Sequence, residues 1–275
     1  GLQHQGDVVE QGIADGQVRE IIGAVDETFL QRMMLVFIDL VSGYLVFEEV
    51  AEQRTYDTWY ALVEPRVERL GTAVVYLVSD RAKALIKLAE TGLGCLSIPD
   101  LFHLIHDLVK SYSLALLGRL RHARQALSQA QERLRVCQGA DPSGAEAQQA
   151  QAVVEARAAQ VQHWETVDST YRQHLESVSL LVHPWRLVDS TRQTSHEVEH
   201  QLQAEIAALE VFVETHGLPA KKTAVDKVRK QLAGVSALVD FWWQGVWHDV
   251  QHMALTPMWR RWMEEVLLPL MYWQQ

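Results

Sequence analysis

The fold is decided by residues 73–91, which read AVVYLVSDRAKALIKLAET. The first seven residues form a continuous apolar run, the mark of a strand that is buried on both faces. Asp80 follows this run directly, and 82–91 shows the spacing of a helix. We therefore expect a buried strand that ends at an acidic residue and leads into a helix.

Three short segments rich in β-branched and aromatic residues precede this stretch, at 19–29, 33–41 and 44–51. Ser42-Gly43, between the second and the third segment, is a hairpin signal. Residues 56–70 then show helical spacing, although Pro65 should kink or split that helix. The pattern predicts a three-stranded meander followed by a helix.

A fifth short strand is expected near Cys95 to Ile98, and Pro99-Asp100 opens a long helix. Three meander strands, then helix, strand, helix, strand and helix, is the order of an RNase H-like fold. Hairpin strands joined to a parallel βαβ portion predict one mixed sheet flanked by helices, and therefore the α/β class.

No strand is expected beyond about residue 113. Residues 113–138 and 145–180 are rich in Ala, Gln, Glu, Arg and Leu, with the loop GADPSG between them. This predicts a long helical hairpin, which we interpret as an intrachain pair rather than a dimerisation arm. Further helices are expected at 195–215, 222–253 and 256–273. We accordingly divide the chain into an RNase H-like core at 1–112 and an all-helical domain at 113–275, with the hairpin at about 113–180 and Trp-rich helices at about 195–275.

The composition is that of a globular protein: 48% of the 275 residues are hydrophobic and 22% are charged. The apolar stretches are short, so we expect no transmembrane helix, and no basic-then-apolar leader follows Gly1. Cys95 and Cys137 lack ligand-like spacing, which argues against a disulfide framework or a cysteine zinc site and favours a cytoplasmic location. The net charge of −10 argues against a dedicated DNA-binding module.

Two acidic residues stand at the ends of strands that should be neighbours. Asp26 ends the first expected strand and Asp80 ends the fourth. Carboxylates that converge there can hold Mg²⁺, which prefers oxygen ligands. The alternative for each is structural, because an Asp after a strand often caps a turn or a helix. Asp39 is a weaker candidate for the first acid, since Asp-Leu-Val-Ser-Gly looks like hairpin chemistry.

The segments AVDETF, LVFIDLVSGYLVFEEVAEQRTYDTW and VVYLVSDRAKALIKLAE resemble insertion-sequence transposases of the DDE class. The resemblance covers about the first 110 residues, and the helical remainder is similar to the insertion that many such enzymes carry before their catalytic Glu. It implies Asp26 and Asp80 as catalytic metal ligands. It also implies cleavage and joining of DNA at transposon ends and target, with Mg²⁺ as the usual ion and Mn²⁺ as a substitute.

The third carboxylate is not fixed by the resemblance, because no Ser-x-x-Glu-x-x-Asn-like motif occurs. Glu264 and Glu265 lie on a late helix, and Glu265 is the internal candidate for the third catalytic acid. The alternative is that the true Glu lies beyond Gln275, in which case the chain is an inactive transposase fragment. A homodimer is a further expectation.

A rival function is suggested by residues 196–200, HEVEH, which match the H-E-x-x-H motif of zinc metallopeptidases. The motif looks like an exposed first turn with Ser195 as N-cap, so we favour a chance match. His103, His106 and Asp107 could bind metal by spacing alone, but satisfied hydrogen bonds are the simpler interpretation.

Tryptophan and basic side chains near the end of the chain could bind DNA by base stacking and phosphate contacts. For the tryptophans we favour a place in the core. For the basic residues, a solvated helix face is the alternative. The residues concerned are Trp242, Trp243, Trp247, Trp259, Trp262, Trp273, Lys221, Lys222, Lys227, Arg229, Lys230, Arg260 and Arg261.

Overall fold

The computed structural model describes residues 18–29, 31–186, 188–219 and 222–273. The chain forms two compact units that meet in sequence between His103 and Leu104. The α/β class is confirmed, since a five-stranded mixed sheet and its helices make up the first unit and helices make up the second. The division falls nine residues before the one drawn from composition, and α4 runs through both positions.

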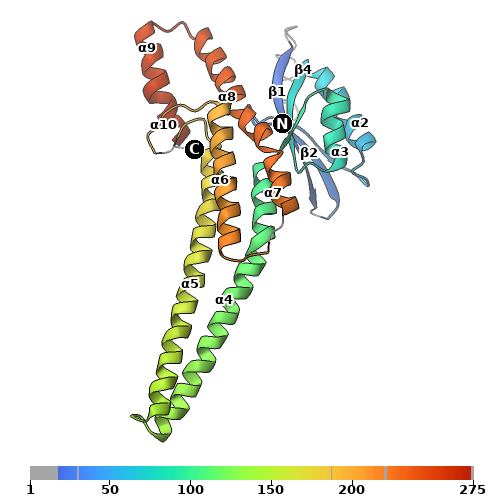
Figure 1. Ribbon diagram of the computed structural model, residues 1–275. Coiled ribbons are helices and arrows are strands. Elements are labelled where there is room, and N and C mark those ends of the chain that lie inside the picture. The colour runs from blue at the N-terminus through green and yellow to red at the C-terminus, as the bar shows by residue number, and fades with distance from the viewer. Residues whose placement is uncertain (1–17, 30, 187, 220–221, 274–275) are drawn as a thin grey trace. The chain divides into compact units, whose positions relative to one another are not determined.

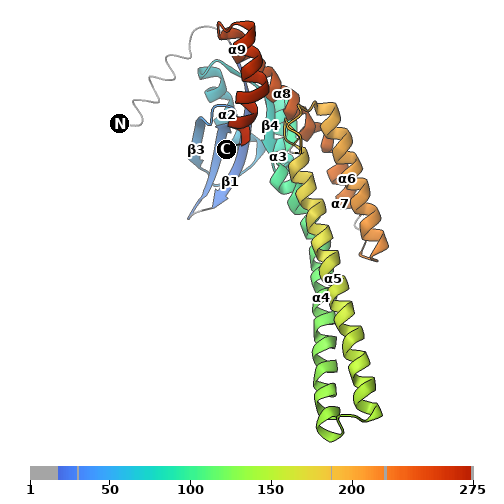
Figure 2. The same ribbon diagram turned by 90° about the vertical axis from the view of Figure 1, so that its left-hand side faces the viewer.

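The sheet has the strand order β3-β2-β1-β4-β5 (Figures 1 and 2). β2 lies antiparallel to both β1 and β3, whereas β4 lies parallel to both β1 and β5. Each strand was expected from sequence, and the observed bounds differ from the expected ones by at most two residues. The strands are β1 (Arg19–Phe29), β2 (Met33–Asp39), β3 (Leu45–Val50), β4 (Thr72–Ser79) and β5 (Leu96–Pro99).

One face of the sheet is packed against the helices that follow β3 and β4. Trp59 and Val63 of α2 (Tyr56–Arg69) and Leu85 of α3 (Lys83–Lys87) are buried in the same core as Phe37 and Leu77 of the strands. α3 continues as the π-helical turn η1 (Leu88–Leu93), which ends at Gly94 with a positive φ of 66°. This core fixes the path of β4 and therefore where its last residue leads.

Gly23 is required in the middle of β1 by the ring that lies over it. A Cβ at this position would stand 2.5 Å from Cε2 of Phe37 and 3.1 Å from Cδ1 of Leu77. Phe37 is fully buried on the neighbouring strand, so its ring fills the space that a side chain would need. The loss of strand propensity at Gly23 is offset by this close packing.

Pro65 does not split α2, although a split was one of the two outcomes expected from sequence, the other being a kink. The helix runs unbroken from Tyr56 to Arg69 with Pro65 inside it. Pro65 lies on the exposed face, as does Ala61, whose carbonyl loses its helical partner. Because that carbonyl can be hydrated and Trp59 and Val63 hold the opposite face in the core, the helix tolerates the proline.

The helical unit is dominated by a long antiparallel hairpin of α4 (Leu101–Ala140) and α5 (Ala145–Leu181), which lie side by side in both ribbon views (Figures 1 and 2). The hairpin confirms the expectation from sequence. Ala123 and Ala130 of α4 and Ala147 and Ala150 of α5 are buried, so small side chains occupy part of the buried seam of the pair.

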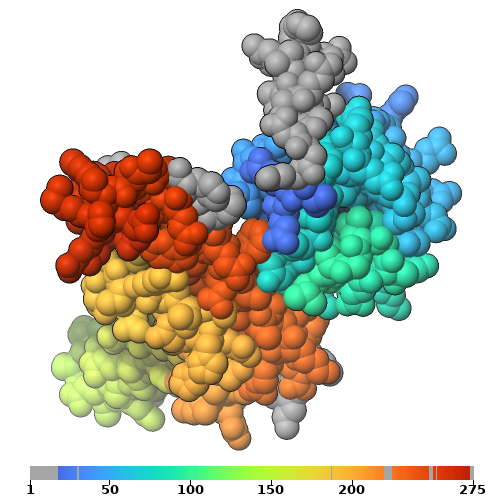
Figure 3. Space-filling model, turned by 90° about the horizontal axis from the view of Figure 1, so that it is seen from above, coloured from blue at the N-terminus to red at the C-terminus, as the bar shows by residue number. Residues whose placement is uncertain are grey.

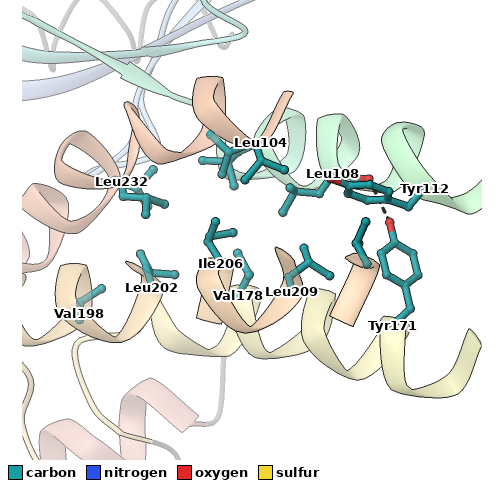
Figure 4. Packing of buried hydrophobic residues seen from close by; sticks show 14 of the residues in the cluster. Leu104, Leu108, Tyr112, Tyr171, Val178, Val198, Leu202, Ile206, Leu209 and Leu232 are labelled. Carbon is teal, nitrogen blue, oxygen red and sulfur yellow. Dashed lines mark hydrogen bonds between the residues drawn. The ribbon is translucent and has the colours of Figure 1, made fainter. Parts of the chain in front are cut away.

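The core of the helical unit gathers where the hairpin meets the later helices. Figure 4 shows Leu104, Leu108 and Tyr112 from α4 opposite Tyr171 of α5, with the side chains of α6 (Ser195–Thr215) beside them. The Tyr171 hydroxyl donates to the carbonyl of Leu108 at 2.9 Å, so the one polar atom of this buried ring is satisfied.

The expected helix at 222–253 is two helices, α7 (Lys222–Arg229) and α8 (Leu232–His252). The last expected helix is α9 (Pro257–Trp262), which passes through the π-helical turn η2 (Met263–Leu267) into α10 (Leu268–Trp273). Figure 3 shows this last segment, in red, at the surface, where the Met258 and Trp259 side chains are exposed. In the part of the chain that the structure describes, every helix is too short or too polar to cross a membrane.

Candidate active site

Asp26 and Asp80 stand at matching positions on adjacent parallel strands. Ala24 of β1 pairs with Val78 of β4, and each aspartate lies two residues further along its own chain. Because side chains two residues apart point to the same face of a strand, both carboxylates lie on the face of Ala24 and Val78, opposite Val25 and Leu77 of the helix-covered core. The topology therefore brings the two predicted acids to one edge and one face of the sheet.

A third acid, which sequence reasoning missed, extends this row onto β5. Val78 pairs with Ile98, so Asp100 follows β5 at the position that Asp80 holds after β4. The Asp100 N–H donates to the carbonyl of Ser79 at 2.8 Å and continues the pairing by one residue. The sequence pattern that could have identified Asp100 is Pro99-Asp100 directly after a short strand. We interpreted this pattern only as the start of a helix.

The three aspartates line one cavity of about 200 Å³, together with Ala24, Val25, Val36, Ile38, Val78 and Ser79. A water occupies about 30 Å³ in the liquid, so the cavity has room for several waters or for an ion with part of its hydration shell. None of these lining residues is Lys, Arg or His. The cavity thus combines negative charge with apolar walls.

The hydrogen bonds at Asp26 and Asp80 come from backbone N–H groups. The Asp26 carboxylate accepts from the N–H of Glu27 at 2.8 Å, and that of Asp80 accepts from Ala82 at 2.7 Å. Asp100 accepts from Phe102 at 2.8 Å and lies 3.1 Å from Nδ1 of His103. Asp80 and Asp100 therefore also stabilise the chain turns in which they lie, as the structural interpretation expected.

The carboxylate oxygens of this cavity fit a hard divalent cation, because Mg²⁺ prefers oxygen ligands and retains several of its waters. Among the described residues, however, no three His, Cys, Asp or Glu side chains are close enough together to hold a metal ion, so a cation here would have fewer than three such ligands from the described residues. One or two carboxylates with retained waters are a common way to bind Mg²⁺.

Asp39, the weaker candidate for the first acid, lies on the other face of the sheet. It pairs with Gly23, three residues before Asp26, so its side chain points toward the α2 side. Its carboxylate accepts from the N–H groups of Val41 and Ser42 and thus closes the β2–β3 turn. Asp39 is a hairpin residue.

Glu265 belongs to the helical unit, where its carboxylate accepts from Nε of Arg261 at 2.9 Å, one helical turn away. Its side chain is 60% exposed. Glu264 lies beside it in η2. The assignment of Glu265 as the third catalytic acid stays a prediction.

The H-E-x-x-H segment forms the first turn of α6, with both histidines exposed. The N-cap is Thr194 and not Ser195, because the Thr194 hydroxyl accepts from the Glu197 N–H while the Glu197 carboxylate accepts from the Thr194 N–H at 2.9 Å. This capping box holds the pKa of Glu197 below its usual range, mainly through the backbone N–H of Thr194. It gives Glu197 a structural role.

The other histidine candidates also have local partners. His103 pairs with Asp100, and Asp107 lies 2.5 Å from Nζ of Lys227 within the helical unit. The remaining member of this group, His106, is exposed on α4.

The core interpretation is confirmed for Trp242, Trp243 and Trp247, which pack against the cluster around Trp185. It is wrong for Trp259 and Trp262, which are 52% and 43% exposed. The Trp273 side chain lies outside the described residues.

Several basic residues near the chain end are paired with acids, which lowers their capacity for phosphate. Lys227 pairs with Asp107, Arg229 with Glu210 and Arg261 with Glu265. Arg260 and Lys230 are exposed. Lys221 and the side chain of Lys222 lie outside the described residues.

No family model matches this sequence, and no curated protein matches it either.

Proposed function

We propose that the chain is the catalytic region of a DDE-type DNA transposase with an RNase H-like sheet. The observation that carries the proposal is the placement of Asp26 and Asp80 at matching positions of adjacent parallel strands, on one face and in one cavity. The strand order supports it, because an antiparallel meander leads into parallel β4 and β5.

Asp26 and Asp80 would hold Mg²⁺, or Mn²⁺ in its place, through their carboxylate oxygens. When bound, the ion would activate a water or a 3′-hydroxyl as the nucleophile and would stabilise the leaving oxygen in phosphodiester displacement. Ala24, Val36 and Val78 line the same cavity, and because Asp26 is exposed and Asp80 is half-buried, both carboxylates can be reached by an ion from solvent. Without a cation the same carboxylates repel a DNA phosphate, so binding of nucleic acid here requires the ion.

Affinity cleavage by iron locates the site independently of activity. Fe²⁺ with ascorbate and peroxide generates radicals at a Mg²⁺ site, and we expect backbone cuts close to residues 26 and 80, mapped by mass spectrometry. Asp26→Asn and Asp80→Asn should abolish these cuts. Asp57→Asn, which changes an exposed acid in the first turn of α2, is the matched control and should leave them intact.

Strand cleavage is tested by divalent-dependent nicking of supercoiled plasmid, with Mn²⁺ as the permissive ion. We expect Asp26→Asn and Asp80→Asn to lower the nicking rate by at least 100-fold and Asp57→Asn to leave it unchanged. Iron cuts that persist in both asparagine variants, at the same positions as in the unaltered chain, would show that these acids hold no cation and would refute the proposal.

The third acid is assigned by comparing Glu265→Gln with Asp100→Asn in the nicking assay. Loss of nicking in the first variant alone identifies Glu265, and loss in the second alone identifies the acid that extends the row onto β5. Iron cuts without nicking in the unaltered chain would instead indicate an inactive transposase fragment that binds the ion but lacks the catalytic Glu.

The rival zinc peptidase makes a different prediction. It requires stoichiometric zinc in the purified protein, lost in His200→Ala. The capping box around Glu197 gives no support to it. A homodimer is tested by sedimentation with and without DNA ends.

A further inference from the structure

Arg81, the residue after Asp80, adopts a backbone conformation that side chains other than glycine rarely take. Its φ is +60°, in the left-handed region. Among the described residues the same is seen at Ser190 and at no other non-glycine position. Such a conformation persists when neighbouring contacts impose it, so the contacts of Arg81 are informative.

Two hydrogen bonds hold Arg81 to the strands on either side of it in sequence. Its N–H donates to Oγ of Ser79 at 3.1 Å, which closes the turn after β4. Its guanidinium donates from Nη1 to the carbonyl of Ser97 on β5 at 2.8 Å. Arg81 therefore ties the turn that follows β4 to the neighbouring parallel strand.

Asp80 stands in sequence between Ser79 and Arg81, the two residues joined by the first of these hydrogen bonds. The left-handed residue at 81 turns the chain so that the N–H of Ala82 reaches Oδ1 of Asp80 at 2.7 Å. The carbonyl of Ser79, on the other side of Asp80, accepts from Asp100 at 2.8 Å. The backbone is thus held on both sides of Asp80, at Ser79 by the N–H of Asp100 and at Arg81 by the tether to Ser97.

We infer that Arg81 is a positioning residue for the metal site, orienting the Asp80 carboxylate through its left-handed backbone and its guanidinium tether to Ser97. This inference rests on the proposed function, because it assigns a role relative to the cation that Asp80 would hold. Arg81 is absent from the residues that line the cavity, so it acts through Asp80. Groups that orient metal ligands typically change metal affinity by about 10–100-fold when removed.

The test measures Mn²⁺ affinity by electron paramagnetic resonance of the free ion, with the full chain and no DNA. Arg81→Gly removes the tether but keeps a residue that accepts φ near +60°, so the backbone is not strained. We expect an affinity about ten-fold lower at an unchanged Tm, and partial recovery on addition of ethylguanidinium. Asp80→Asn should lose binding and gain nothing from ethylguanidinium.

Ser190→Gly is the matched control, because it makes the same change at the other left-handed position and should leave Mn²⁺ affinity unaltered. Hydrogen exchange of peptides covering residues 80–83 gives a second readout that needs no metal. Exchange there should be faster in Arg81→Gly and unchanged in Ser190→Gly.

The outcomes separate the two proposals. Loss of Mn²⁺ binding in Asp80→Asn with full affinity in Arg81→Gly overturns the positioning role and leaves the proposed function standing. Unchanged Mn²⁺ affinity in both Asp26→Asn and Asp80→Asn overturns both.

Discussion

The paired acids of the helical unit have different partners from Asp26 and Asp80 of the sheet unit, although Glu27 and Glu49 of the sheet unit also pair with arginines. In the helical unit, carboxylates are paired with basic side chains; such pairs include Arg124–Glu165, Arg172–Asp168, Lys227–Asp107, Arg229–Glu210 and Arg261–Glu265. At the edge of the sheet, Asp26 and Asp80 accept hydrogen bonds from backbone N–H groups beside an apolar-walled cavity. A carboxylate with a basic neighbour has its charge offset, whereas under the proposed function the charge of Asp26 and Asp80 would be offset by a cation.

The cores differ as well. The sheet unit has a core of aliphatic side chains with Phe37, Phe47 and Trp59, and the ring centroids of Phe47 and Trp59 are 6.2 Å apart. The helical unit relies on tyrosine and tryptophan in its core, with hydrogen bonds such as Tyr171 to Leu108 and Trp243 to Gln193. The comparison predicts that the units respond separately to core substitutions and to pH.

The largest effect is expected from Trp59→Ala. Trp59 is fully buried against the sheet, so its removal should cost about 3–5 kcal/mol of the free energy of unfolding of the sheet unit. Trp262→Ala, at an exposed tryptophan of the helical unit, is the control and should cost little. Urea unfolding followed by hydrogen exchange of peptides from β2 and α6 separates the two units. Equal loss of protection in both peptides would show that the units unfold together.

A smaller effect is expected at the α6 N-cap. Thr194→Ala removes one half of the capping box and should destabilise the helical unit by about 1 kcal/mol, measured as a shift in Tm. Because the folded-state pKa of Glu197 is lowered, its contribution is present above the usual pKa of 4.5 and is lost as the pH falls through the folded-state value. A capping-box variant that keeps the acid sensitivity of the unaltered chain would contradict this account.

An effect of similar size at neutral pH is expected from Tyr171→Phe, which removes the hydrogen bond to Leu108 and should cost about 1 kcal/mol. Burial raises the pKa of Tyr171 to about 12. A raised tyrosine pKa contributes stability that is intact below pH 10 and lost as the pH rises from 10 toward 12. Thermal unfolding between pH 8 and 12 should therefore show less alkaline destabilisation in the variant. Part of the alkaline destabilisation should remain in Tyr171→Phe, because burial also raises the pKa of Tyr272 to about 12.

Strands and most helices could be predicted because their signals are local. β1, β4 and the α4–α5 hairpin follow from runs of apolar or helix-forming residues. Asp80 follows from a strand end, whereas Asp26 was expected at a strand end and lies inside β1, three residues before Phe29. Asp100 could not be recognised, because its place in the row depends on the register of β4 against β5, which no local pattern encodes. The conformation of Arg81 was missed for a similar reason, since its partner Ser97 lies sixteen residues away on another strand.

Pro65 and Thr194 show the opposite limit. Local rules predicted a kink or a split of the helix at Pro65 and placed the N-cap of α6 one residue too late, at Ser195. Tertiary packing of Trp59 and Val63 overrides the proline, and the cap depends on which hydroxyl reaches the third N–H.

The contact between Gly23 and Phe37 couples the residue types that these two positions can carry. An alanine in place of Gly23 cannot coexist with the Phe37 ring where it now lies, because its Cβ would stand 2.5 Å from Cε2. A smaller side chain in place of Phe37 would release that constraint and leave a void that the added methyl group only partly fills. Homologous chains should therefore covary at these positions, keeping glycine wherever the facing strand carries an aromatic ring.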